Sequence, residues 1–170
     1  MVPVSEQTYI GRMDPQDYPH FMELALREAQ LAFEENEVPV GAVVVFENRV
    51  IGRGHNRTIA LADASAHAEM IALSAAYNHF GDWRLEECYL FSTLEPCVMC
   101  AGASVLSRIK TIVYGASDPK FGGCGSIFTI PTETKLNHRC EIVRGVCEEE
   151  VAALMKLFFQ QVRQNKSKVN

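Results

Sequence analysis

The sequence predicts an α/β fold in which helices pack on a β-sheet. Residues 17–35 carry apolar side chains at helical spacing, with charged residues on the opposite side. Two runs rich in β-formers, 40–46 and 49–55, are separated by a two-residue turn, which indicates a hairpin. From Cys88 onward, strands alternate with helices, a pattern typical of parallel strands covered by helices.

The remaining elements are expected in the following order. Residues 1–14 should form an irregular arm, and a loop over 56–64 should lead into a helix for which Ser65 is the N-cap. Pro96 should open the next helix, because proline lacks the N–H that a first turn leaves unpaired. The expected ranges are helix 66–77, strand 88–92, helix 96–107, strand 111–114, strand 140–144 and helix 148–164.

Length and composition suit one domain spanning residues 1–170. A chain of 170 residues with 48% hydrophobic composition is large enough for a full core. The amino end has neither the basic segment nor the apolar run of a signal peptide, and no stretch of about 18 apolar residues predicts a membrane span. We therefore expect a cytoplasmic protein with no membrane association, whose six cysteines are metal ligands or buried thiols rather than disulfides.

The net charge of −5 hides an uneven distribution. Residues 1–100 carry 15 acidic and 6 basic side chains, whereas residues 101–170 carry 6 acidic and 10 basic side chains. After Glu150 the chain has four basic residues and no acidic one. This asymmetry permits a surface that contacts phosphates, although basic residues near a helix end also complement the helix dipole.

His67, Cys97 and Cys100 can supply three ligands to one metal ion. The 29 residues between His67 and Cys97 are enough for the rest of a helix, a turn and a strand, so the two segments can meet. Zinc binds nitrogen and sulfur in a tetrahedron, and a catalytic zinc site leaves the fourth position to water, whose pKa falls to about 7. Glu69 is the candidate to carry the proton of that water to the leaving group.

Each motif alone has an ordinary interpretation. A C-x-x-C pair can be redox-active, and a single histidine at a helix start is commonly a polar surface residue. A closed structural zinc site would take its fourth ligand from the other cysteines, which are Cys88, Cys124, Cys140 and Cys147. Such a site would leave Glu69 beside the metal without a task, so the combination of motifs favours catalysis.

Two further segments are candidates for substrate binding. Asn56 lies in the loop that leads into His67, where its amide can hold a substrate or merely satisfy its own turn; the spacing leaves both open. The glycine-rich segment 118–126 follows an expected strand, at the edge of the sheet where α/β proteins bind ligands. We expect this segment to line a substrate channel.

The motifs resemble those of a known enzyme family. His67-Ala68-Glu69 followed by Pro96-Cys97-Val98-Met99-Cys100 matches the established signature of zinc-dependent nucleobase deaminases, a match of motif rather than a deduction from spacing. Together with other segments, the chain closely resembles the bacterial tRNA-specific adenosine deaminase (TadA) family over about residues 18–165. Those segments are Val38-Pro39-Val40-Gly41-Ala42-Val43, Gly54-x-Asn56-Arg57, Leu94-Glu95-Pro96 through Ala103, and Asn137-His138-Arg139.

The resemblance implies a cytidine-deaminase-like fold, which is a three-layer α/β/α sandwich around a five-stranded mixed sheet. It also implies a homodimer with one zinc ion per subunit, and conversion of the wobble adenosine of a tRNA anticodon stem-loop to inosine. By position, it implies zinc ligands at His67, Cys97 and Cys100, a proton shuttle at Glu69, a pocket asparagine at Asn56, and anticodon-loop contacts at Asp118 and Lys120. The loop 58–63 departs from the family pattern, which leaves the nucleotide contacts there open.

Two rival functions remain at this point. Deamination of a free purine such as guanine by a similar zinc site needs no basic tail and predicts turnover without tRNA. A noncatalytic zinc module that binds RNA or a protein partner would keep its function after Glu69→Ala.

Overall fold

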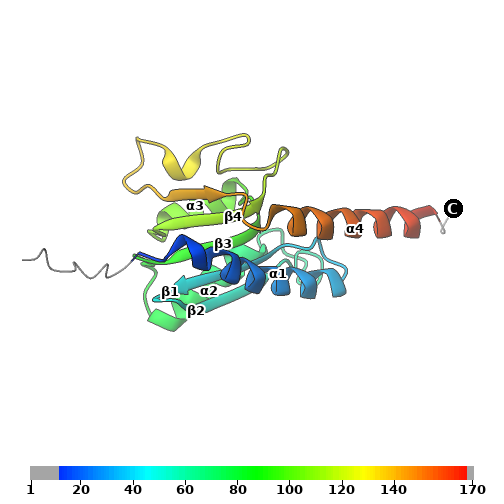
Figure 1. The fold of residues 1–170 in the computed structure, drawn as a ribbon, viewed down its shortest axis with the longest axis horizontal. Helices are drawn as coiled ribbons and strands as arrows, with labels where there is room; N and C mark the ends of the chain where they lie inside the picture. The colour runs from blue at the N-terminus through cyan, green and yellow to red at the C-terminus, as the bar shows by residue number, and fades with distance from the viewer. Residues whose placement is uncertain (1–11, 168–170) are drawn as a thin grey trace, which may run out of the picture.

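The computed structural model describes residues 12–167, and the side chains of residues 12–165. Within these residues, five strands form one sheet in the order β2-β1-β3-β4-β5 (Figure 1). In chain order the elements are η1 (Pro15–Asp17), α1 (Tyr18–Glu34), β1 (Gly41–Phe46), β2 (Arg49–His55), α2 (Ala68–Phe80), β3 (Tyr89–Leu94), α3 (Val98–Leu106), β4 (Thr111–Ala116), η2 (Ile130–Thr132), β5 (Glu141–Arg144) and α4 (Glu148–Ser167). The expected ranges agree with these to within three residues at each end.

The sheet contains both strand directions. β1 pairs antiparallel with β2 and with β3, whereas β3, β4 and β5 run parallel to one another. The hairpin between β1 and β2 turns at Glu47 and Asn48, whose φ values of 47° and 58° suit a two-residue hairpin turn. Both the hairpin and the parallel pairing after Cys88 are therefore confirmed.

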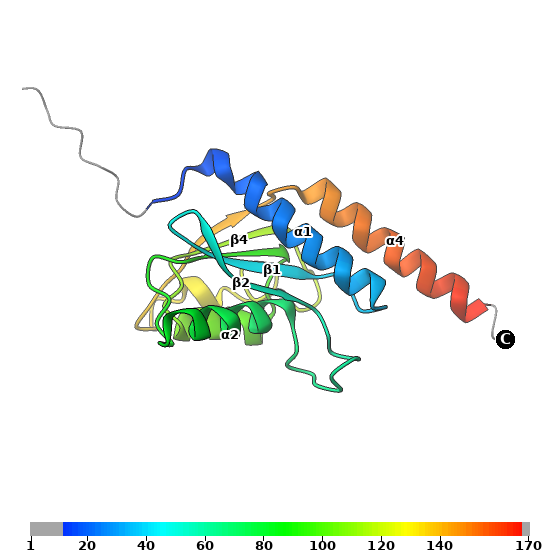
Figure 2. The ribbon, with the colours of Figure 1, turned by 90° about the horizontal axis from the view of Figure 1, so that it is seen from below.

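Helices cover both faces of this sheet. α1 and α4 lie together on one face, and α2 and α3 lie on the other (Figures 1 and 2). The apolar cluster under α1 joins Met22 to Val43 and Phe91, and the cluster on the opposite face joins Leu73 of α2 to Leu90. The three-layer α/β/α sandwich around a five-stranded mixed sheet is confirmed. None of the helices within residues 12–167 is long and apolar enough to cross a membrane.

The expected start of α2 was wrong. Ser65 does not cap the helix, because its N–H and its hydroxyl both donate to Asp63 Oδ1, at 2.8 and 2.7 Å. His67 is the N-cap instead, with an extended backbone (φ −77°, ψ 152°), and its carbonyl accepts the first helical hydrogen bond, from the N–H of Ile71. Glu69 therefore lies in the first turn, while the histidine precedes it.

The expected start of α3 was wrong for a related reason. Cys97 is the N-cap, again with an extended backbone (φ −69°, ψ 175°), and Pro96 lies outside the helix. The carbonyl of Pro96 accepts the N–H of Gly123 at 2.8 Å, and Cys97 forms an antiparallel bridge with Gly122. These contacts hold residues 96 and 97 in an extended conformation, so the helix begins at Val98.

The amino-terminal arm was expected to extend to residue 14. Residues 1–11 lie outside the described residues, but Met13 is buried and its N–H donates to the hydroxyl of Tyr89 at 3.0 Å. Asp14 caps η1 by accepting the N–H of Gln16 at 2.9 Å. The packed structure therefore includes residues that the sequence assigned to the arm, since one buried methionine produces no periodic signal.

Candidate active site

The candidate site lies at one edge of the sheet. The carboxyl ends of β2, β3 and β4 meet the amino end of β1 there, because β1 runs antiparallel to β3. The amino ends of α2 and α3 reach the same edge, with His67 and Cys97 as their N-caps. An N-cap side chain projects beyond the first turn, so both helices present a potential metal ligand to the space in front of them.

The three expected ligands form a nearly equilateral triangle. Nδ1 of His67 lies 3.5 Å from Sγ of Cys97 and 3.6 Å from Sγ of Cys100, and the two sulfurs are 3.6 Å apart. In a tetrahedral zinc site, bonds of about 2.3 Å to sulfur and about 2.0–2.1 Å to nitrogen separate N from S by about 3.6 Å and S from S by about 3.8 Å. The donor triangle therefore fits a zinc ion without rearrangement.

The electrostatics of the two thiols also favour a cation. The hydrogen bond between the two thiols, opposed by burial and assisted by His67, lowers the pKa of Cys97 to about 4. The same hydrogen bond and burial raise the pKa of Cys100. The thiolate is the form that binds metal, and binding releases the remaining thiol proton.

The other cysteines do not complete a closed metal site. Within the described part of the chain, the only group of His, Cys, Asp or Glu side chains close enough to share an ion contains His67, Cys97 and Cys100. All six cysteines are free, and the thiol of Cys124 is directed to the carbonyl oxygen of Pro96, 3.9 Å away. Three protein ligands and a free fourth position are characteristic of catalytic rather than structural zinc.

Glu69 lies beside this triangle as a buried carboxylate. Its side chain is 3% exposed, and Oε1 accepts the hydroxyl of Ser92 at 3.3 Å. Burial raises its pKa, against the opposing effects of its own backbone N–H and of His67. A carboxylate with a raised pKa holds a proton more readily than a free carboxylate does, which suits a group that accepts a proton and returns it.

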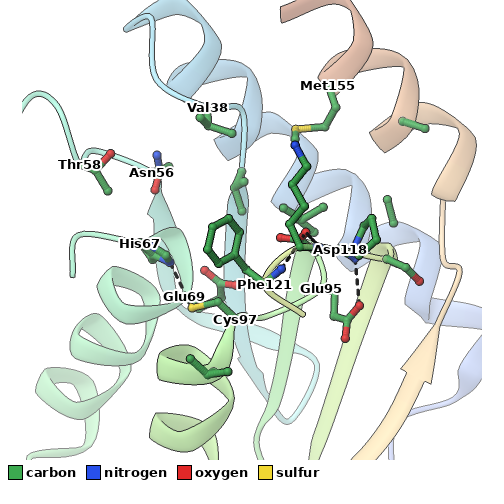
Figure 3. A pocket seen from close by; sticks show the side chains of 18 of the residues that line it. Val38, Asn56, Thr58, His67, Glu69, Glu95, Cys97, Asp118, Phe121 and Met155 are labelled. Carbon is green, nitrogen blue, oxygen red and sulfur yellow. Dashed lines mark hydrogen bonds between the residues drawn. The ribbon is translucent and has the colours of Figure 1, made fainter. Parts of the chain in front are cut away.

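A cavity of about 780 Å³ opens above the donor triangle. His67, Glu69 and Cys97 converge at its base, while Asn56 and Asp118 line its walls (Figure 3). The cavity falls within the range of about 300–1,000 Å³ that is typical of small-molecule sites. The residues that line the cavity come from segments 38–40, 56–58 and 116–121, from the starts of α2 and α3, and from one side of α4.

Asn56 is held by a buried carboxylate that the sequence did not single out. Glu37 is 1% exposed and accepts the side-chain amide of Asn56 at 3.4 Å, the hydroxyl of Thr58 at 3.2 Å, and the N–H groups of Ile59 and Ala60 at 2.8 Å each. A carboxylate can only accept, so Glu37 fixes which end of the amide faces it. The amide carbonyl oxygen of Asn56 is thereby left for the cavity.

Glu95 is a second buried carboxylate, and it lies at the carboxyl end of β3, where pocket residues are expected, although the sequence assigned it no role. It is 2% exposed and accepts the N–H groups of Asp118, Cys124 and Ser126 at 2.9, 3.0 and 3.0 Å, and also the hydroxyl of Ser126. Burial alone would raise its pKa, but these hydrogen bonds lower it. Glu95 thus anchors the glycine-rich segment 118–126, of which residues 118–121 line the cavity and residues 122–126 do not.

The two expected contacts on this segment differ in what they already bind. Oδ1 of Asp118 accepts the N–H groups of Lys120 and Phe121 at 2.9 and 3.2 Å, so this oxygen serves the local turn. Lys120 lines the cavity, is exposed, and forms no ion pair with any residue that the structure describes. Its charge is therefore available to a ligand.

Comparison with known proteins identifies the family of the chain. The model of the MafB19-like deaminase family matches residues 16–163. A tRNA-specific adenosine deaminase of Streptococcus pyogenes (serotype M18, strain MGAS8232) is 44% identical over 151 residues, covering 89% of this chain and 95% of the relative.

Solved structures of both candidate enzyme types are similar to this chain. One, from studies of A-to-I editing by tRNA:A34 deaminases at the wobble position of transfer RNA, has a TM-score of 0.77 and 44% identity, covering 79% of this chain and 98% of that chain. A guanine deaminase from Bacillus subtilis has a TM-score of 0.56 and 32% identity, covering 62% of this chain and 66% of that chain. With its hydrolytic site and these similarities, the chain belongs to the tRNA-specific adenosine deaminase family.

Proposed function

We propose that this enzyme converts the wobble adenosine of a tRNA anticodon loop to inosine, with water consumed and ammonia released. The observation that carries the proposal is the donor triangle of His67, Cys97 and Cys100, with zinc-like spacing, beside buried Glu69 at the base of the cavity. Membership of the tRNA-specific adenosine deaminase family supports the substrate class.

His67, Cys97 and Cys100 would hold one zinc ion per subunit. When bound, zinc lowers the pKa of a coordinated water to about 7, which makes a nucleophile available at neutral pH. Glu69 takes the proton of the attacking water and transfers it to N1 of adenine. Glu69 then carries the remaining proton of that water, from the hydroxyl now bonded to C6, to the amino group. The C6–N bond breaks, ammonia leaves, and the C6 oxygen remains as the inosine carbonyl.

The target base must leave its stack to reach Glu69. An anticodon loop is already unpaired, so this costs less than it would in a duplex. The carbonyl oxygen of Asn56, held in place by Glu37, is suited to accept a hydrogen bond from an N–H group of the base. Asp118 and Lys120 would contact the surrounding loop nucleotides, Asp118 through its second carboxylate oxygen.

Lys120 and the basic carboxyl end would contact the phosphates. Arg139, expected in the same role, precedes the amino end of β5 and therefore lies at the opposite edge of the sheet from the cavity. Neutralising phosphates releases counterions, so binding of an anticodon stem-loop should weaken as salt rises, with a log–log slope of about −0.7 for each single-stranded phosphate contacted. Replacing Lys120 by alanine should make that slope shallower by one such contact. Binding that does not change with salt would remove these residues from the proposal.

The decisive experiment offers the enzyme both candidate substrates. Incubation with total bacterial tRNA, followed by nucleoside mass analysis, should reveal inosine, and Glu69→Gln should reveal none above background. Parallel incubation with guanine should release no more ammonia than the Glu69→Gln enzyme does. The opposite pattern would establish the free-purine deaminase instead, and inosine formed equally by the Glu69→Gln enzyme would exclude the proposed chemistry.

We also propose one domain, a homodimer, and a cytoplasmic location where tRNA is available. The dimer is supported by large apolar side chains left exposed on α3 and on the neighbouring segment that contains η2. Leu106 is 74% exposed and Phe128 is 53% exposed. Such surfaces commonly mark protein interfaces.

A further inference from the structure

One exposed aromatic residue lines the cavity without a role in the proposed chemistry. Phe121 is 67% exposed, yet its ring points into the cavity near the candidate catalytic residues (Figure 3). Within the part of the chain described by the structure, this ring contacts no other aromatic ring. An apolar ring held in this position gains little from the protein alone, so its partner is expected to be a ligand.

The turn that carries Phe121 is fixed at both ends. The N–H of Phe121 donates to Oδ1 of Asp118 at 3.2 Å, and the N–H of Gly122 donates to the Asp118 carbonyl at 3.0 Å. The N–H of Asp118 is bound in turn by Glu95 at 2.9 Å. A Cβ on Gly122 would lie 2.5 Å from Cδ of Glu95, so the turn rests directly on the buried carboxylate.

The same turn is joined to a metal ligand. Gly122 and Cys97 form an antiparallel bridge, and a Cβ on Gly123 would lie 3.0 Å from the backbone of Cys97. The ring of Phe121 is therefore positioned relative to the donor triangle by short backbone contacts rather than by a long, free loop. The ring is therefore held at a fixed distance from the place where the reacting base would bind.

We propose that Phe121 stacks on an unpaired nucleobase that flanks the adenosine being deaminated. The target base must lie at the base of the cavity beside buried Glu69, whereas Phe121 lines the same cavity but is two-thirds exposed, so its ring is accessible to a neighbouring nucleotide. Stacking on an aromatic ring tolerates any base, because every base has a π-face. Lys120, adjacent in the chain and without an ion pair among the described residues, supplies the cation for a nearby phosphate.

The inference rests on the proposed function and names a positioning residue for it. Phe121 touches the flanking base and not the reacting atoms. Its loss should therefore raise KM for RNA while leaving kcat nearly unchanged. A purely apolar contact, for instance with a second copy of this chain, would be retained by leucine, and a π-stack would not.

The test uses an anticodon stem-loop with 2-aminopurine beside the target adenosine, because stacking quenches the fluorescence of this base. Wild-type protein should quench it, and Phe121→Leu should abolish the quenching and raise KM roughly five- to hundredfold, as expected for the loss of one base–aromatic stack. Trp83→Leu is the matched control. Trp83 is a 49% exposed aromatic residue that follows the carboxyl end of α2, whereas the cavity lies at the amino end.

A second variant guards against misfolding of the first. Trp83 is the only tryptophan in the chain, so Phe121→Trp in a Trp83→Phe background places a single reporter at the proposed site. Stem-loop binding should quench its emission and preserve KM. Unchanged KM and quenching in Phe121→Leu, or unquenched tryptophan with bound RNA, would overturn the inference. Failure of the wild-type enzyme to form inosine in the unmodified stem-loop would instead overturn the proposed function.

Discussion

Glu69 is buried, and its burial affects how readily its carboxylate binds a proton. It is 3% exposed, lines the cavity and lies two residues after His67, a candidate metal ligand that caps the same helix. Burial raises its pKa, which suits a group that must both accept and release a proton. A structural role would require only its hydrogen bond with Ser92.

Glu69→Gln should separate these roles. Glutamine keeps the size of the side chain and its acceptor oxygen but cannot take a proton, so kcat should fall by at least about 100-fold, the lower bound usual for general acid–base catalysis. Zinc content, measured by plasma mass spectrometry, should stay at one ion per subunit. Glu86→Gln, a change at an exposed acid beyond the carboxyl end of α2, should alter neither quantity. Activity retained in the Glu69 variant would exclude it as the proton carrier.

The sequence could predict the donor triangle but not the carboxylates behind it. His67, Cys97 and Cys100 are residue types whose chemistry is specific and whose spacing is compatible with one ion. Glu37 and Glu95 act through backbone N–H groups 22 to 31 positions away, and nothing local marks those partners. The only available signal was a proline nearby at the boundary of a buried segment: Pro96 directly follows Glu95, and Pro39 lies two residues after Glu37.

Glu95→Gln should therefore affect the glycine-rich segment more than the metal. One acceptor oxygen becomes an NH₂ group that faces N–H donors, and an unsatisfied buried group costs about 1–3 kcal/mol. Thermal unfolding should show this loss, and KM for an anticodon stem-loop should rise while zinc is retained. Glu86→Gln is again the control. A variant with wild-type stability and KM would show that the segment holds its conformation without Glu95.

Helix starts were the least predictable part of the elements. Standard capping logic selects Ser65 and Pro96, yet both helices begin two residues later because His67 and Cys97 themselves occupy the N-cap positions. Neither histidine nor cysteine is a preferred cap. Tertiary contacts, such as the bridge between Cys97 and Gly122, decide where the helix begins. The sequence alone does not reveal these contacts.

The close approach of β2 to α2 also positions His67, a candidate metal ligand. A Cβ on Gly54 would lie 2.3 Å from the carbonyl oxygen of Ala68, the residue after His67, and a Cβ on Gly52 would lie 2.2 Å from the carbonyl of Ala72, one turn further along. Both contacts involve helix backbone, which cannot move aside as a side chain would. Glycine at these two positions lets the helix rest directly on the strand.

Gly54→Ala should displace the amino end of α2 and with it His67. Forced overpacking costs about 1–3 kcal/mol, so the midpoint of chemical denaturation should fall, and zinc should be lost to a chelator faster than from wild type. Gly52→Ala should destabilise the fold to a similar extent but retain zinc better, since its clash lies a turn away from the ligand. Equal chelator sensitivity in the two variants would contradict a local effect on His67.

At the scale of the molecule, the layers and the number of strands could be predicted, whereas the strand order could not. Periodicity identifies each strand, and the helices between strands imply parallel pairing. The placement of β1 between β2 and β3 depends on contacts between distant segments. That order brings Asn56, His67, Glu95 and Asp118 to one edge, so the site itself depends on the topology.

Large apolar side chains that remain exposed on α3 and around η2 suggest where two subunits meet. Leu106 at the end of α3 is 74% exposed, and Ile127, Phe128 and Leu136 are 47%, 53% and 40% exposed around the η2 segment that packs beside α3. Burying such side chains between two subunits is favourable by about 25 cal/mol for each Å² of apolar area. The face is therefore the expected site of contact between two copies of the chain.

Leu106→Glu should prevent two copies of the chain from forming the proposed dimer. A carboxylate buried in an apolar interface is costly, whereas at a position already exposed to solvent it leaves the fold of the subunit intact. Light scattering after gel filtration should give about half the wild-type mass, with unchanged circular dichroism. Ile59→Glu is a matched control, because Ile59 is also 74% exposed but lies in the loop held by Glu37, away from α3. A wild-type mass for Leu106→Glu would show that the subunits meet elsewhere.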